Sequence, residues 1–357
     1  MFESLGLTDT TPREASVLFA LALGLAFGIL AERTGFCLRR SVVGEDSMQA
    51  RGVWLTALAV SLLATQAAVA LGWIAFDAHR FLAPGLPVLA IALGGLAFGA
   101  GMVLTRGCAS RLLVLGGSGN LRALLVLVVF AIVAHATMKG VLAPLRTGLG
   151  GITVDLGQWA SLSALPGGAW GVTLVIAASA LWVALRSGNR VTALAGGALI
   201  GLLAAIGWVG TGFVLQDEFD PIAHESLSFT APAADSLFFA LAATSIPAGF
   251  GTGLVGGVLL GALVASLFAG SFRWQSFESP AQTGRYMAGA ALMGVGGVLA
   301  GGCTLGAGLS GTATLGVSAF LALAFIVLGA LGAQALSVRS SAAAGAPRAR
   351  PPLQPAE

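Results

Sequence analysis

Long apolar runs separated by short polar segments make up most of the chain. A hydrocarbon core about 30 Å thick needs about 20 apolar residues in each helix that crosses it. Nine runs approach that length, and we expect membrane-spanning helices over residues 15–31, 53–76, 85–105, 121–144, 169–186, 191–213, 253–270, 286–301 and 315–336. The pattern therefore predicts an all-α polytopic membrane protein embedded in the lipid bilayer.

The composition excludes an ordinary soluble domain. Apolar residues make up 57% of the chain and charged residues only 9%, and the mean hydropathy is +0.92. A soluble surface needs a several-fold higher density of charge. The 52 glycines include pairs at small-xxx-small spacing, which let helices approach closely: Gly24–Gly28, Gly95–Gly99 and Gly257–Gly261.

The basic residues predict an orientation in the membrane. If the nine spans alternate, one side receives four of the 18 lysines and arginines (Arg13, Arg80, Lys139 and Arg146) and the other side receives the remaining 14. The positive-inside rule then puts the amino terminus in the periplasm and the carboxyl terminus in the cytoplasm. The basic charge reflects this topology, and no nucleic-acid partner is expected.

Four apolar segments are too short or too glycine-broken to cross the membrane: residues 34–46, 107–119, 233–248 and 302–313. Non-helical backbone at membrane depth must be buried in protein or line a cavity, so these segments are candidate re-entrant elements. Their flanks repeat, since GLAFGILAERTGFCL (24–38) resembles GLAFGAGMVLTRGCA (95–109). A shift of 195 residues aligns RGC (106–108) with GGC (301–303). A shift of 177 aligns TGFC (34–37) with TGFV (211–214), so that Val214 stands where a fourth cysteine is expected.

Helix counting makes the repeat an inverted one. The halves are residues 15–145 and 191–336, and the odd linking helix 169–186 turns the second half over. We expect one transporter domain over residues 1–337 and a disordered cytoplasmic tail over 338–357, which is rich in proline and alanine. Transporters with inverted repeats bind substrate near the midplane, where broken helices of both halves meet.

The chain has three cysteines, Cys37, Cys108 and Cys303, and all fall at the same position of the repeat. A free cysteine is often only a small buried apolar residue, but three at one repeat position favour a thiol-lined pathway. No CxxC or cysteine–histidine spacing predicts a metal site, and no cofactor is expected. Weak thiol donors with the N–H groups of glycine-rich turns suit a soft anion that must also be released.

The motifs RTGFCLRR, TRGCASR and GGCTLGAGLSG resemble the three cysteine motifs of the YeeE/YedE family of bacterial inner-membrane proteins. The resemblance implies thiosulfate uptake through an hourglass-shaped, pseudo-symmetric fold of nine spanning helices and short re-entrant helices. It also implies that Cys37, Cys108 and Cys303 pass the ion along by S–H···S contacts. Some relatives are linked to selenium or other sulfur compounds, and many have a cytosolic sulfurtransferase-like partner.

Residues next to the cysteines complete the predicted substrate site. Gly107 and Gly302 are expected to let the backbone approach the ion. Arg33 and Arg106 are expected to draw the anion towards the cytoplasmic exit, with interfacial anchoring or an ion pair with Glu32 as the alternative.

Two further segments receive structural interpretations. The G-x-G-x-x-G at 306–311 follows a membrane helix and not a strand, which excludes a dinucleotide site. Its glycines are expected to let the backbone turn tightly beside the ion, with plain close packing of helices as the alternative. The acidic segment 216–226 is expected to be a solvated cap, because it would repel a dianion.

The leading hypothesis is a permease, not an enzyme. Three alternatives stay open at this stage. One is a membrane sulfurtransfer enzyme in which Cys108 accepts sulfur as a persulfide. The others are a permease for a selenium or other sulfur compound and a metal-handling scaffold.

Overall fold

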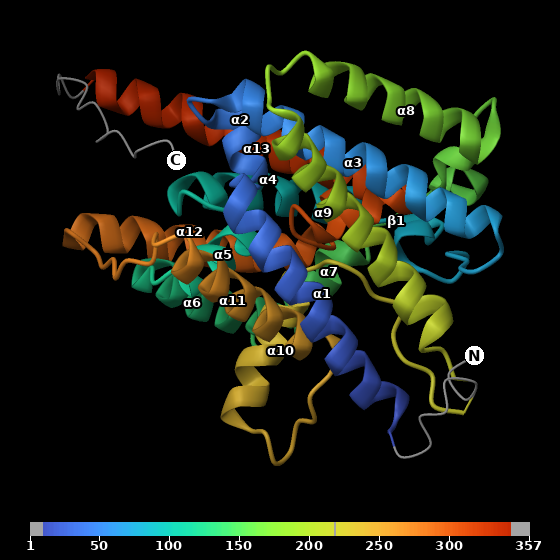
Figure 1. Cartoon of the computed structure of the whole chain (residues 1–357), viewed down its shortest axis with the longest axis horizontal. Coiled ribbons are helices and arrows are strands. Elements are labelled where there is room, and N and C mark those ends of the chain that lie inside the picture. The colour runs from blue at the N-terminus through green and yellow to red at the C-terminus, as the bar shows by residue number, and fades with distance from the viewer. Residues whose placement is uncertain (1–9, 218, 344–357) are drawn as a thin grey trace.

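The computed structural model describes residues 10–217 and 219–343, and within them the chain is a bundle of helices (Figure 1). The α-helices are α1 (Pro12–Thr34), α2 (Leu38–Val43), α3 (Ser47–Ala70), α4 (Val88–Leu104), α5 (Ala109–Gly117), α6 (Leu121–Lys139), α7 (Ala143–Gly150), α8 (Gly168–Leu185), α9 (Val191–Val209), α10 (Thr230–Leu241), α11 (Phe250–Phe268), α12 (Pro280–Leu299) and α13 (Val317–Ala343). Shorter turns are the π-helical η5 (Gly210–Val214) and η6 (Gly306–Gly311) and the 3-10 turns η2 (Arg80–Leu82), η3 (Gly157–Ala160), η4 (Leu162–Ala164) and η7 (Thr312–Thr314). Two short antiparallel strands, β1 (Gly85–Leu86) and β2 (Val154–Asp155), pair with each other.

Each predicted span falls on a helix, which confirms the all-α membrane class. Eight helical segments in the described part of the chain are long and apolar enough to cross a membrane: Pro12–Val43, Ser47–Ala70, Val88–Gly117, Leu121–Lys139, Gly168–Leu185, Val191–Val214, Phe250–Phe268 and Val317–Arg339. The remaining predicted span, 286–301, falls on α12, whose first turns carry Gln282 and Arg285. The total of nine spans stays a prediction.

Helix α1 shows how local sequence sets the ends of a span. The Thr11 hydroxyl accepts the backbone N–H of Glu14, and the Glu14 carboxylate accepts the Thr11 N–H in return, which forms a capping box. Pro12 follows at the first helical position, where its missing N–H costs nothing. The helix ends where Gly35 takes a left-handed conformation with φ of 60°.

Glycines bring the long helices into backbone contact. The pairs predicted from spacing all lie at helix crossings: Gly24 and Gly28 of α1 lie against the backbone of α11, Gly257 and Gly261 of α11 lie against that of α1, and Gly95 and Gly99 of α4 lie against α13. A Cβ atom at these positions would overlap main-chain atoms of the partner helix or, at Gly95, the Cβ atom of Phe325. The closest helix pairs in the bundle therefore depend on the absence of side chains.

Short helices occur at the four segments predicted to be re-entrant. They are α2, α5, α10 and the π-helical turn η6. The carboxyl end differs from expectation, because α13 continues to Ala343, into the segment predicted as a disordered tail. Residues 344–357 of that predicted tail lie outside the described residues.

The helix pairs form a regular pattern. Helix α1 packs on α11 and α3 packs on α9, while α4 packs on α13 and α6 packs on α12. Helix α8 lies along α3 at the edge of the bundle (Figure 1). One large buried cluster joins most of these helices and contains all three cysteines.

Candidate functional site

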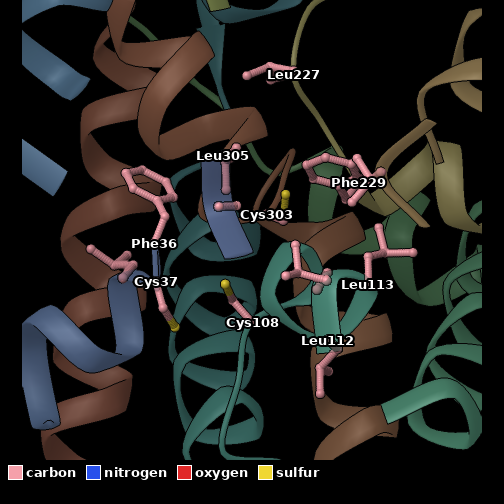
Figure 2. Close-up of a cluster of buried hydrophobic side chains, with 14 of the residues drawn as sticks. Phe36, Cys37, Cys108, Leu112, Leu113, Leu227, Phe229, Cys303 and Leu305 are labelled. Atoms are coloured by element: carbon pink, nitrogen blue, oxygen red, sulfur yellow. The ribbon is translucent and has the colours of Figure 1, made fainter. Parts of the chain in front are cut away.

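The three cysteines, distant in sequence, meet in the centre of the buried cluster. Only 6% of Cys37 is exposed, and Cys108 and Cys303 are fully buried. Figure 2 shows Cys108 between Cys37 and Cys303, with the three sulfur atoms following one another across the view. All three are free thiols.

The backbone around each cysteine follows the same path. The residue two positions earlier has a left-handed conformation, and the cysteine carbonyl then accepts the N–H of the residue four positions later. The three instances are Gly35 (φ 60°), Cys37 and Ser41; Arg106 (φ 59°), Cys108 and Leu112; and Gly301 (φ 77°), Cys303 and Ala307. Cys37 and Cys108 are therefore the residues that begin α2 and α5, and Cys303 precedes η6, so that each cysteine lies between a sharp turn and a short helical element.

Each sulfur also faces the start of its own helical element. It lies near the backbone N–H of the residue three positions on, which is Arg40, Arg111 or Gly306. For Gly306 this is a hydrogen bond, with 3.4 Å between N and Sγ. The thiols accordingly lie where helix starts offer backbone donors.

Cys108 interacts with both other thiols. Its side chain is within hydrogen-bonding range of the Cys37 side chain, and it also lies close enough to Cys303 for the two thiols to affect each other. Its sulfur lies 3.2 Å from the Ser110 hydroxyl oxygen. The hydroxyl of Thr304 faces Cys108 and is fully buried without a hydrogen-bond partner. Two hydroxyl groups, those of Ser110 and Thr304, therefore lie beside the Cys108 thiol.

Val214, predicted as the fourth repeat position, is not among the residues of the buried cluster that contains the cysteines. Val214 lies in η5, whereas Phe229 is the residue that begins α10. Its backbone N–H faces the sulfur of Cys303, and its ring lies in the same cluster (Figure 2). Residues 215–229 form a long connection between η5 and α10, so a constant shift that aligns TGFC with TGFV does not bring Cys37 onto the residue that begins α10.

Gly107 and Gly302, the glycines predicted at the substrate site, differ in the space available for a side chain. A Cβ atom on Gly302 would come within 2.8 Å of the Ala307 backbone N, so glycine is required there. On Gly107 it would reach only ordinary contact distance, 3.5 Å from Leu112. The expectation of a tight turn at 306–311 was wrong in its position, because the left-handed turn lies at Gly301. The glycines of η6 instead allow close packing, as at Gly306 beneath Ser228.

The predicted arginines are less central than the cysteines. Arg33 and Arg106 are both exposed, and Glu32 pairs with Arg111 (3.4 Å) rather than with Arg33. Sequence reasoning missed Arg39, whose Nε is buried without a hydrogen-bond partner and whose charge acts on Cys37. Its only signal was its place two residues after that cysteine.

A recess of about 560 Å³ lies beside the Cys303 end of the thiol cluster. Its walls come from residues 75–81 and from the connection between η5 and α10, and the backbone of Gly306 and Ser310 also lines it. The segment 216–226, predicted to be a solvated cap, also lines this recess through Gln216 and residues 223–226.

Two histidines and an aromatic cluster support the recess wall. The His224 ring stacks on Phe76 with centroids 5.0 Å apart, and its Nε2 donates to the Trp208 carbonyl at 3.2 Å. Burial, together with Arg80 and His224, lowers the pKa of His79 to about 4, and burial also lowers the pKa of His224. Both imidazoles are therefore neutral near pH 7.

No group of three or more histidine, cysteine or acidic residues in the described ranges could hold a metal ion. The three thiols lie in a line, each beside its own helix start, and have no histidine or carboxylate among the neighbours described above. This donor set does not have the clustered ligands of a structural zinc or copper site.

Fold and site together define a polytopic helical membrane protein with a thiol-lined interior. The chain belongs to the YeeE/YedE sulphur transport family, whose model matches residues 33–332. No curated protein matched the chain. The protein is therefore a multi-pass membrane transporter of sulfur compounds.

Proposed function

We propose that the protein takes up thiosulfate across the bacterial inner membrane along a path through Cys303, Cys108 and Cys37. The observation that carries the proposal is the meeting of three free thiols from distant motifs in one buried cluster. Thiols are weak donors that suit a soft sulfur anion and hold it without a deep trap. Weak successive sites are what conduction requires.

The proposed passage is non-covalent. The terminal sulfur of thiosulfate accepts an S–H···S contact from one thiol and then from the next, so no bond forms or breaks and no electron moves. Cys108 is the middle station, and the hydroxyls of Ser110 and Thr304 beside it can donate to the oxyanion end. Thr304 would then gain the hydrogen-bond partner that it lacks.

The proposal includes two inverted halves and nine spans. A two-fold axis that relates the halves would superpose α1 on α9 and α3 on α11. The α1–α11 contact would then become the α9–α3 contact. The matching exchange of α4 with α12 and α6 with α13 turns α4–α13 into α12–α6. All four of these contacts are present, which supports a pseudo-two-fold arrangement around the thiols.

Uptake of radiolabelled thiosulfate tests the proposal in bacteria that lack their own thiosulfate and sulfate importers. The wild type should accumulate labelled thiosulfate and not labelled sulfate, and Cys108→Ala should abolish the uptake at equal membrane levels. Ser266→Ala is the matched control, because it also removes one buried heteroatom but lies in α11 outside the thiol cluster. A folded wild type that carries no thiosulfate would refute the thiosulfate claim and lead to the same assay with selenium analogues.

Thiosulfate labelled separately at each sulfur distinguishes transport from sulfurtransfer. A permease delivers both labels to the cytosol in equal amounts. A persulfide enzyme would retain the outer-sulfur label on Cys108 and release the inner-sulfur label as sulfite, and that outcome would replace the permease with the enzyme. In the proposed orientation, a cytosolic sulfurtransferase-like partner would receive the ion at the Cys37 end.

A further inference from the structure

Helix α8, which links the two predicted halves, is held to the bundle along one narrow face. Its buried residues are all small and recur at helical spacing: Thr173, Ala177, Ala180 and Ala184. This face packs chiefly on α3, and the rest of α8 is exposed at the edge of the bundle (Figure 1). Because α8 is apolar all round, lipid covers the remainder of its surface.

The α8–α9 turn, residues 186–190, lies against the start of α3. The side-chain amide of Asn189 donates to the Gln49 carbonyl at 2.8 Å, and a Cβ atom on Gly52 would overlap the Ser187 side chain. The carboxyl end of α8 and the amino ends of α3 and α9 therefore meet on one side of the bundle. Since all three are ends of apolar spans, they meet at the level of the lipid headgroups.

Each of these three helix ends carries an exposed arginine: Arg51 of α3, Arg186 at the end of α8 and Arg190 just before α9. None of the three has an ion-pair partner among residues 10–217 and 219–343. Asp46, the carboxylate before α3, is paired with Arg40. Arg51 makes one hydrogen bond, from Nε to the Ser41 carbonyl at 3.4 Å. The meeting point therefore holds positive charge that no described carboxylate neutralises.

The Arg186 guanidinium is oriented by an aromatic ring. Its Cζ atom lies 4.1 Å from the centroid of the Trp182 ring, and 57% of Trp182 is exposed. A guanidinium that stacks on an indole keeps its N–H donors at its edge, where they can bind the oxygen atoms of a phosphate. Tryptophan near the end of a span lies at the membrane interface. Arg186 is thus held where the phosphate of a lipid lies.

We propose that the α8–α9 turn and Arg51 form a binding site for the phosphodiester headgroup of an anionic phospholipid. Arg186 and Arg190 donate charge-assisted hydrogen bonds to the phosphate, and Trp182 packs beside the acyl chains. A headgroup with a net negative charge is favoured, because basic pockets at the ends of membrane helices attract anionic lipids. The bound lipid covers the exposed side of the α8–α3 contact and holds the linking helix on the bundle. The site is separate from the thiols and does not depend on the proposed transport function.

Native mass spectrometry of the full-length protein in detergent tests the site with phosphatidylglycerol, and with phosphatidylcholine as the comparison lipid without net charge. The wild type should bind phosphatidylglycerol about tenfold more tightly, and Arg186→Gln and Arg190→Gln should each raise its Kd about fivefold, the effect of one arginine at an anionic surface. Arg273→Gln is the matched control, because it removes an exposed arginine between α11 and α12 on the same predicted side of the membrane. Its Kd should not change, and an equal rise in this variant would overturn the site.

Thermal unfolding measures the consequence for α8. Phosphatidylglycerol should raise the unfolding midpoint of the wild type more than phosphatidylcholine does. The double variant Arg186→Gln/Arg190→Gln should lose most of this difference, because the lipid no longer holds α8 on α3. A double variant that phosphatidylglycerol stabilises as much as it stabilises the wild type overturns the proposal.

Trp182→Leu separates an oriented site from charge alone. It keeps every charge and an apolar side chain towards the lipid, yet it should raise the Kd for phosphatidylglycerol about threefold, because Arg186 loses the ring that orients it. If the arginine variants fail to fold, an unchanged Kd in Trp182→Leu overturns the proposal. Inorganic phosphate at the concentration of the lipid should not displace phosphatidylglycerol. Displacement would identify a site for free phosphate and would also overturn the proposal.

Discussion

Arg106 has a left-handed backbone conformation at a position where the other two cysteine motifs have glycine. Its φ of 59° matches the 60° of Gly35 and the 77° of Gly301. A non-glycine residue in this region is strained by roughly 1–2 kcal/mol. A residue that keeps such a cost at a functional site is a candidate for a functional role of its side chain.

Replacing Arg106 with glycine separates its backbone from its charge. We expect Arg106→Gly to stabilise the protein by about 1 kcal/mol, because glycine adopts this conformation without strain. The same change should raise the KM for thiosulfate if the guanidinium draws the anion, as proposed for the cytoplasmic end. Thermal unfolding in detergent and vesicle uptake measure the two effects. A variant that is more stable and transports normally would remove Arg106 from the site.

His79 makes the stability of the recess dependent on pH. Its pKa falls from 6.5 to about 4 in the folded chain, chiefly through burial and also through Arg80 and His224. The folded state therefore binds fewer protons than the unfolded state between these values, so stability is full above pH 6.5 and is lost as the pH falls towards 4. The midpoint of thermal unfolding should decrease over this window. His79→Gln should flatten the decrease, and an equally steep decrease in that variant would contradict the assignment.

At the scale of elements, glycine contacts join the long helices. Gly257 of α11 lies against the backbone of α1 near Leu21, whereas its neighbour Gly256 has only the end of the Leu21 side chain nearby, at 3.8 Å from an added Cβ. Two adjacent glycines in one helix therefore face different amounts of space.

This difference gives a matched pair of variants. Gly257→Ala should destabilise the protein by about 1–3 kcal/mol, because the new methyl group forces α1 and α11 apart. Gly256→Ala should be neutral or slightly stabilising, because alanine favours a helix. Thermal unfolding in the same detergent compares them. Equal midpoints would mean that α1 and α11 separate without cost.

The sequence predicted elements better than it predicted their connections. The predicted spans and the predicted short segments fall on helices because apolar length and broken glycine runs are local properties. The place of Phe229 beside Cys303 could not be predicted, because it depends on a long connection whose path no local pattern encodes. The residues that line the recess beside Cys303 could not be predicted for a similar reason, since Arg80 and Glu225 come from segments far apart in the sequence.

At the scale of the whole molecule, the predicted orientation can be tested on the exposed residues Ser163 and Ser276. Ser163 precedes α8 on the side assigned to the periplasm, and Ser276 precedes α12 on the side assigned to the cytoplasm. A membrane-impermeant maleimide should label Ser163→Cys in intact cells and Ser276→Cys only after permeabilisation. The native thiols are buried and give little background. The reverse labelling pattern would invert the topology and the direction of transport.

The left-handed turn before each cysteine makes the position of the sulfur atom a property of the main chain. Exchanging the sulfur for oxygen or selenium, as serine or selenocysteine, would leave the turn and the helix start as they are. The backbone around Cys37, Cys108 and Cys303 can therefore present oxygen, sulfur or selenium at the same three places. Such substitutions change the polarizability of the side-chain atoms along the path while the backbone keeps its geometry. The preference between sulfur and selenium anions can therefore change without a change of fold.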